Sequence, residues 1–270
     1  MPKVIFFPYH WHVEDLEDHV TIHIFGLTRK NKSVYIVIND FKPWIYVELP
    51  TSISWTHSNA KLVGNKLDWL CGKRENYNGD ILNIATTPVS KKFILMKKLY
   101  YASANNKTFP FLKLDFHTLQ AIKKFTWKIK KPISIPRIGK IKLKCHEHNA
   151  NAIIQLTSLQ NISTAGWIEC TGVKQTEKTT WCHKEFTVKT KSLQPYTQTE
   201  LPIPIPLILS FDIEVNSTNP SAMPNAKNPG DKVFQISCVL FRKNKYEKYL
   251  LTLGEPNPNK IGEDVEIEMY

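Results

Sequence analysis

The stretch PLILSFDIEV, residues 206–215, places two acidic side chains, Asp212 and Glu214, within an otherwise apolar run. Such a run is typical of a buried strand, and side chains two residues apart on a strand point to the same face. Two neighbouring carboxylates in a buried strand are unfavourable unless a cation compensates them. Divalent ions bound by oxygen ligands are the usual compensation, and paired metals activate water for attack on a phosphodiester. We therefore predict Asp212 and Glu214 to be metal ligands and catalytic residues.

The composition is that of an ordinary globular protein, with 42% apolar and 22% charged side chains among 270 residues. This length accommodates one large domain or two ordinary ones. Neither an apolar run of about 18 residues nor a small-residue cleavage site is evident, so we expect no membrane span and no signal peptide. The five scattered cysteines indicate free thiols in a reducing compartment.

Positive charge is concentrated in residues 121–144, which contain nine Lys or Arg and no acid, within a net charge of +12. Such a block is typical of polyanion binding, and a strand edge protected by lysines is the alternative. Aromatic residues lie among these lysines, but Phe125 and Trp127 would share a face in a strand, so we interpret them as core. The candidate nucleic-acid-binding residues are Lys123, Lys124, Lys128, Lys130, Lys131, Arg137, Lys140, Lys142 and Lys144.

The pattern of β-branched and aromatic residues predicts a β-rich first part of the chain. The proline-alternating segment LPIPIP, residues 201–206, predicts an extended spacer and a domain boundary. Strands are expected over residues 21–26, 33–38, 41–49, 93–96, 111–116, 207–215, 233–241 and 246–253. Short helices are expected over residues 117–124 and 149–159, and irregular structure over residues 51–87 and 171–199.

A structural zinc site is an alternative function for the residues around Cys145 and Cys182. Together with His146, His148 and His183, these cysteines could supply tetrahedral ligands. Their spacing differs from that of a compact zinc finger, so we favour a polar surface patch.

Several segments resemble family B DNA polymerases of the delta type. The segment SFDIE, residues 210–214, resembles their first exonuclease motif, and the strand at residues 235–237 is similar to the one that follows it. Residues 22–28 and 41–47 resemble the opening of these polymerases, and GWIE at residues 166–169 resembles a further strand. The matches run in order over nearly the whole chain, in a style closest to polymerases of large DNA viruses.

The resemblance implies an α+β and α/β fold in two domains. Residues 1–200 would form a β-rich N-terminal domain that contacts nucleic acid. Residues 201–270 would begin a ribonuclease-H-like 3′–5′ exonuclease domain. There, Asp212 and Glu214 would hold two divalent ions, Mg²⁺, that activate water to remove a mismatched 3′ nucleotide.

The resemblance also implies the role of the intact protein, which would extend and proofread primers in DNA replication. Its partners would be primer–template DNA, dNTPs and a sliding clamp, in the nucleus or a viral replication compartment, without membrane contact. The further exonuclease motifs and the polymerase-site aspartates are missing from these 270 residues, so this fragment alone is expected to be inactive. Competing hypotheses are a non-catalytic basic nucleic-acid-binding module and a structural viral protein.

Overall fold

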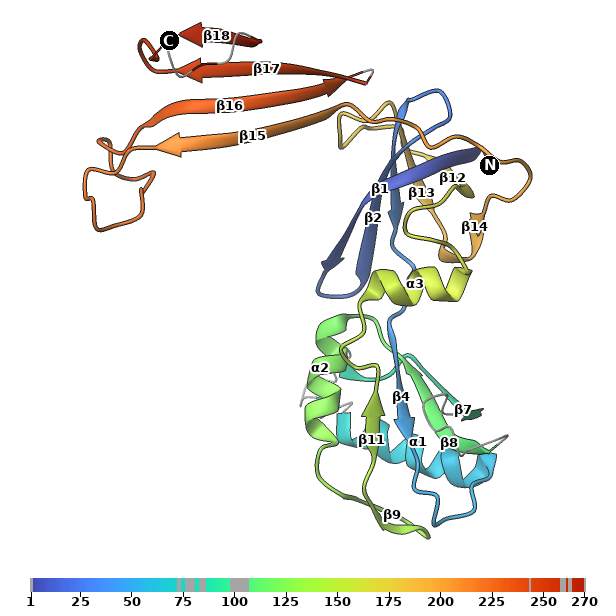
Figure 1. Ribbon diagram of the computed structural model, residues 1–270. Helices are drawn as coiled ribbons and strands as arrows, with labels where there is room; N and C mark the ends of the chain where they lie inside the picture. The colour runs from blue at the N-terminus through green and yellow to red at the C-terminus, as the bar shows by residue number, and fades with distance from the viewer. Residues whose placement is uncertain are drawn as a thin grey trace. The chain divides into compact units, whose positions relative to one another are not determined.

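The structure, a computed structural model, describes residues 2–71, 74–75, 81–82, 86–97, 107–242, 244–257, 261 and 264–269. The chain forms two compact units, Met1–Pro202 and Ile203–Tyr270. They are called the first and the second unit here, and each is described by itself (Figure 1).

Five strands of the first unit close into a barrel. These are β1 (Lys3–Asp15), β2 (Val20–Leu27), β3 (Ser33–Ile38), β12 (Ile168–Lys174) and β13 (Lys184–Val188). The strand β1 pairs with β12 through its first residues and with β2 through the rest, while β13 lies parallel to β3 and antiparallel to β12. Because the ring closes, these strands form a small five-stranded barrel of the kind found in OB-folds.

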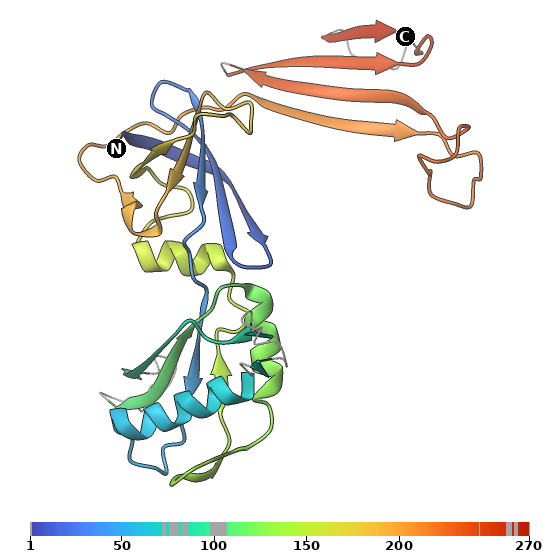
Figure 2. The ribbon, with the colours of Figure 1, turned by 180° about the vertical axis from the view of Figure 1, so that it is seen from behind.

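The barrel interior is filled by alternating apolar side chains. Ile22 and Ile24 of β2 face inward together with Ile36 of β3, and all three are fully buried. The helix α3 (Ala152–Gln160) adds Leu156 to the same core, and Figure 2 shows it beneath the barrel strands. A short strand β14 (Gln194–Pro195), preceded by a 3₁₀ turn at Thr190–Ser192, pairs antiparallel with the start of β12.

A second sheet is built from the chain between β3 and α3. Its strands are β4 (Trp44–Glu48), β7 (Ser90–Lys97), β8 (Thr108–Asp115) and β11 (Lys144–His146), in the order β11-β4-β8-β7. The helices α1 (His57–Cys71) and α2 (Leu119–Lys128) pack on one face and enclose a second core. The succession β-α-β-β-α-β is that of a ferredoxin-like unit. The strand pairs β5 (Arg74–Glu75) with β6 (Ile81–Leu82), and β9 (Ile133–Ile135) with β10 (Gly139–Ile141), form separate hairpins.

The prediction of irregular structure over residues 51–87 was wrong for residues 57–71, which form α1; residues 72–73, 76–80 and 83–85 of that range lie outside the described part of the chain. Glycine is common in loops, yet Gly64 lies on the buried face of the helix, where the aliphatic part of Lys91 crosses it. The buried residues follow helical spacing. They are Ala60, Val63, Gly64, Leu67 and Cys71.

The prediction of irregular structure over residues 171–199 was also wrong, because β12 extends to Lys174 and β13 completes the barrel. The strand β13 buries Phe186 and Val188, and even Glu185 is only 2% exposed. Its polar composition hid these few core positions, and its partner β3 lies far back in the sequence.

The other expected strands and both expected helices are confirmed, with α2 extending beyond its predicted end to Lys128. In the second unit, the three expected strands are β15 (Ile208–Val215), β16 (Val233–Arg242) and β17 (Lys245–Thr252), and they form an antiparallel succession. A further strand, β18 (Val265–Met269), pairs in parallel with β17.

No helix in the part of the chain that the structure describes is both long and apolar enough to cross a bilayer.

Candidate functional site

The two candidate metal ligands, Asp212 and Glu214, lie on β15 and are called the carboxylate pair here. In the antiparallel register with β16, Asp212 lies opposite Ser237 and Glu214 lies opposite Gln235. The pairing is regular up to Glu214, and the first irregularity follows it. Because side chains alternate along a strand, both carboxylates project from the same face of the sheet. The sequence-based prediction of a shared face is therefore supported by the strand geometry.

The expectation that this strand is buried was wrong. The side chains of Phe211 and Ile213 are 62% and 44% exposed, and both acids are exposed as well. The strand β15 is the edge of its sheet, with β16 as its single neighbour among the described strands. An apolar run indicates that a strand would be stabilised by another element packing on it, but the run itself does not provide that packing partner. The argument for metal binding consequently rests on the shared face of the carboxylates and not on burial.

The surroundings of the carboxylate pair are those of an open site. A backbone N–H, that of Ile213, donates to Asp212 Oδ1 at 3.1 Å. Within the described ranges, no Lys or Arg forms an ion pair with either acid, and no third His, Cys, Asp or Glu joins them in a potential metal site. The pair can therefore offer oxygen ligands to a cation, and further ligands would have to come from outside this group.

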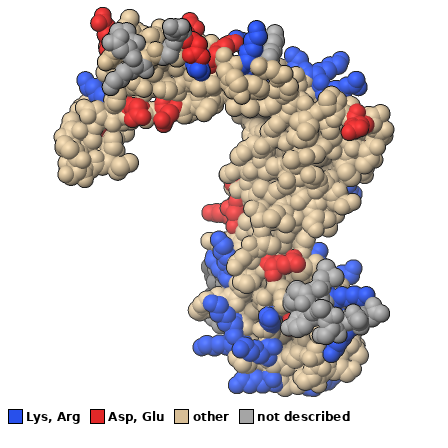
Figure 3. Space-filling view, viewed as in Figure 1, with Lys and Arg blue, Asp and Glu red and all other residues tan. Residues whose placement is uncertain are grey.

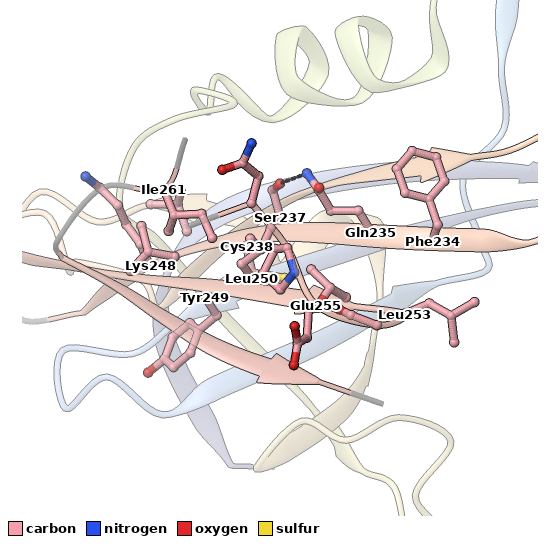
Figure 4. A pocket seen from close by; sticks show the side chains of 16 residues that line it. Phe234, Gln235, Ser237, Cys238, Lys248, Tyr249, Leu250, Leu253, Glu255 and Ile261 are labelled. Carbon is pink, nitrogen blue, oxygen red and sulfur yellow. Dashed lines mark hydrogen bonds between the residues drawn. The ribbon is translucent and has the colours of Figure 1, made fainter. Parts of the chain in front are cut away.

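The face that carries the carboxylates continues across the sheet into a cavity. Gln235 and Ser237 lie opposite the carboxylate pair, and the Gln235 amide donates to Ser237 Oγ at 3.3 Å (Figure 4). The cavity has a volume of about 620 Å³. Besides these two residues, its lining includes Leu250, Thr252, Glu255, Asn257 and Ile261.

The nine predicted nucleic-acid-binding residues lie on α2, on the loop between α2 and β9, on the β9–β10 hairpin and on the segment from there to the start of β11. Figure 3 shows Lys and Arg gathered over this part of the first unit. Lys128 is the exception, since it is half-buried and donates to the carbonyl of Cys71 at the end of α1. The remaining eight are exposed, and no described acid forms an ion pair with any of them. Together these eight residues are called the basic surface.

The interpretation of Phe125 and Trp127 as neighbours on one buried face was wrong. They lie in α2, which starts at a Thr118 cap whose hydroxyl accepts from Ala121 N at 3.0 Å. On the helix Phe125 is fully buried, whereas Trp127 is 71% exposed. Helical spacing of Ile122 and Phe125 was the signal that could have revealed Trp127 as an exposed residue of the basic surface region.

The residues considered for zinc lie apart in the fold. Cys145 packs against the core of the second sheet, and burial raises the pKa of its thiol to about 12. His146 Nε2 lies 2.8 Å from Glu48 Oε2. His183, in contrast, lies beside the barrel, where its Nδ1 is 2.7 Å from Ser33 Oγ. All five cysteines have free thiols.

Comparison with known proteins agrees with this architecture. The model of a family described as "DNA polymerase family B, exonuclease domain" matches residues 143–270. The chain is 34% identical to DNA polymerase 120R of Invertebrate iridescent virus 3 over 95% of its length, and 32% identical to DNA polymerase 037L of Invertebrate iridescent virus 6 over 93%. The fold resembles that of the family B DNA polymerase of Pyrobaculum calidifontis, with a TM-score of 0.61, 13% identity and coverage of 93% of this chain and 27% of that one.

Residues 143–270 therefore match the exonuclease domain of family B DNA polymerases, and the two iridescent virus relatives are named DNA polymerases. The chain spans 24% and 21% of the length of the two iridescent virus relatives.

Proposed function

We propose that the chain supplies the nucleic-acid-contacting first domain of a family B DNA polymerase and the start of its ribonuclease-H-like 3′–5′ exonuclease. The observation that carries this proposal is the carboxylate pair, which lies on one face of β15 in the region that matches the exonuclease family. In the intact protein, excision would remove a mismatched 3′ nucleotide from the primer.

The donor set of the carboxylate pair suits Mg²⁺, because both acids are exposed, lie on one face and offer hard oxygen atoms. Bound divalent ions would supply Lewis acidity and lower the pKa of a bound water. The chain itself would hold the two carboxylates at fixed spacing, through the regular pairing of β15 with β16.

The whole protein would act in DNA replication, with primer–template DNA and dNTPs as substrates and a sliding clamp as a further partner. The iridescent virus relatives, which are named DNA polymerases, support this proposal. It places the protein in the nucleus or in a viral replication compartment.

Titration of the chain with Mn²⁺, followed by electron paramagnetic resonance, tests the metal assignment. Asp212→Asn with Glu214→Gln should abolish the bound signal. The matched control is Glu266→Gln with Glu268→Gln, because these acids have the same spacing on β18 of the same sheet. Equal loss of Mn²⁺ binding in both double variants would refute a specific role for Asp212 and Glu214.

The full-length enzyme tests the catalytic assignment. In it, the Asp212 and Glu214 variants should lose excision of a 3′-mismatched primer and keep primer extension. Excision at the wild-type rate would show that these carboxylates are not catalytic.

A second candidate function, a non-catalytic nucleic-acid-binding module, is favoured by the exposed and unpaired basic surface. Phosphate contacts release counterions, so the affinity for DNA should fall steeply with salt. Loss of DNA binding on neutralising the basic surface, together with no metal binding at the carboxylate pair, would favour this candidate over the exonuclease.

A further inference from the structure

The helix α2 and the turn that follows it present a narrow stripe of Lys123, Trp127 and Lys130 to solvent. Lys123 and Trp127 are four positions apart and share one helical face, and Lys130 lies just past the helix end at Lys128, where its backbone N–H donates to the Trp127 carbonyl at 3.4 Å. All three residues are exposed. The opposite face buries Ile122 and Phe125 in the core of the second sheet. Packing of that face therefore fixes the direction of the stripe.

The stripe borders a cavity of about 410 Å³ between α2 and β11. This volume falls within the roughly 300–1,000 Å³ of small-ligand pockets. The lining is apolar at Ile129 and Leu143, which are buried. Lys144 and His148 add polar groups from the side of β11. The cavity thus combines an apolar floor with cations at its rim.

The tryptophan at this rim has an uncovered ring. Within the described chain, no cation lies over Trp127, and the side chain is 71% exposed. Trp69 of α1 is exposed to the same fraction, but Lys66 Nζ lies 3.5 Å from the centroid of its ring. Trp127 therefore offers a flat aromatic surface next to free ammonium groups, whereas Trp69 already has a partner.

No buried anion disfavours a phosphate in this cavity. Cys145 lines it, and burial raises the pKa of that thiol to about 12, so the thiol stays neutral at physiological pH. The described residues that line the cavity include no Asp or Glu.

We propose that this cavity is a binding site for single-stranded DNA, with one base stacked on Trp127 and the flanking phosphates held by Lys123, Lys130 and Lys144. Every base has an aromatic face, and aromatic platforms inside basic grooves are how proteins bind single strands without reading sequence. In a paired duplex the bases are stacked on each other, so the ring selects single strands. The inference rests on the proposed contact of the first unit with nucleic acid and assigns that contact to specific residues.

The test is fluorescence anisotropy of the whole chain with a labelled oligothymidylate. Trp127→Ala should weaken binding roughly 5- to 100-fold, the range expected for the loss of one stacked base. Trp127→Phe should recover part of the loss. The matched control, Trp69→Ala, should bind as the wild type does. Because Trp127 is exposed, the thermal midpoint of Trp127→Ala should equal that of the wild type.

Salt titrations separate the stacking contribution from the charge contribution. Replacing Lys123, Lys130 and Lys144 by Gln should reduce the slope of log K against log salt by about 2, since each phosphate contact on a single strand contributes about 0.7. Trp127→Ala should instead lower the affinity at every salt concentration and leave the slope unchanged. It should also leave the weaker binding of duplex DNA unaltered.

Three results would overturn the inference. These are wild-type affinity of Trp127→Ala, an equal loss in Trp69→Ala, and tighter binding of oligouridylate than of oligothymidylate. If the wild-type chain bound no DNA at all, the proposed contact of the first unit with nucleic acid would fail too. If the chain bound DNA but the Trp127 variants bound it as the wild type does, the proposed contact with nucleic acid would remain and would be assigned to the basic surface alone. Neither result depends on metal binding at the carboxylate pair.

Discussion

The side chain of Gln155 forms hydrogen bonds with both backbone groups of Trp44. Its Nε2 donates to the Trp44 carbonyl at 2.7 Å, and its Oε1 accepts from the Trp44 amide at 3.3 Å. Gln155 lies on α3 beside the barrel and is 4% exposed, whereas Trp44 begins β4 of the second sheet. One buried amide therefore joins the two halves of the first unit.

Replacing this glutamine by leucine should destabilise the first unit. Gln155→Leu leaves the N–H and C=O of Trp44 buried without these partners, and an unsatisfied buried group costs about 1–3 kcal/mol. Urea unfolding measures the change. Gln120→Leu on α2 is the control, because the Gln120 side chain is exposed and the residue's bond to Asp15 Oδ2 is made by its backbone N–H, which the substitution keeps. Equal midpoints for both variants would contradict the role given to Gln155.

Glu185 makes the stability of the barrel depend on pH. Burial by itself would raise the pKa of its carboxyl, but hydrogen bonds from Thr179 and Thr180 hold that pKa below its ordinary value of 4.5. Both backbone N–H groups and both hydroxyls donate to the carboxylate, at 2.7 to 3.1 Å. The unfolded chain consequently binds a proton more readily. The stabilisation is complete above the ordinary pKa and is lost as pH falls through the lowered one.

Unfolding at pH 7 and at a pH well below the ordinary value of 4.5 checks this dependence. Glu185→Gln should be less stable than the wild type at pH 7 and should lose less stability on acidification. The exposed Glu177, replaced by Gln, provides the control and should follow the wild type at both pH values. An acid-induced loss as large in Glu185→Gln as in the wild type would assign the pH dependence to other groups.

Two glycines should respond in opposite directions to substitution by alanine. At Gly26, an added Cβ would collide with the carbonyl oxygen of Phe7, where β1 passes from β12 to β2. Rigid backbone cannot move aside, so Gly26→Ala should lower the free energy of unfolding by about 1–3 kcal/mol. At Gly64, the Cβ would meet Lys91 Cδ at 3.3 Å, and this flexible side chain can shift.

Gly64→Ala should therefore gain helix propensity and stabilise the protein by about 0.5–1 kcal/mol. Chemical denaturation of both variants gives the comparison. Destabilisation of equal size at Gly64 would mean that Lys91 is held as firmly as the backbone at Gly26.

The sequence pattern revealed those parts of the fold whose signals are local. The β-branched and aromatic residues at 21–26 and 33–38 predicted two strands, which pair as β2 and β3, and the spacing of Asp212 and Glu214 predicted their shared face. The exposure of β15 could not be predicted in this way, because the burial of a strand depends on which other elements pack on it. The strand β13 was missed because it has few core residues, and these can be recognised as core only once the strand is paired with β3.

Of the candidate DNA site, the lysines were predicted, but Trp127 was missed for a different reason. Phe125 and Trp127 fit a period of two as readily as a place on a helix, and the wrong period put both on one face. The choice became clear only when Ile122, Phe125 and Ile129 were found together in one core. An exposed tryptophan is visible only after the helix is placed.

The parallel pairing of β13 with β3 has a consequence for biosynthesis. The second sheet lies between β3 and β13 in the sequence. The ribosome therefore releases β3 long before it synthesises β13, Lys184–Val188. Until then the nascent chain carries an open strand edge, which favours association with other chains. We expect ribosome-bound chains arrested before residue 184 to recruit chaperones more strongly than those arrested after the first unit has emerged, and crosslinking of stalled complexes would measure the difference.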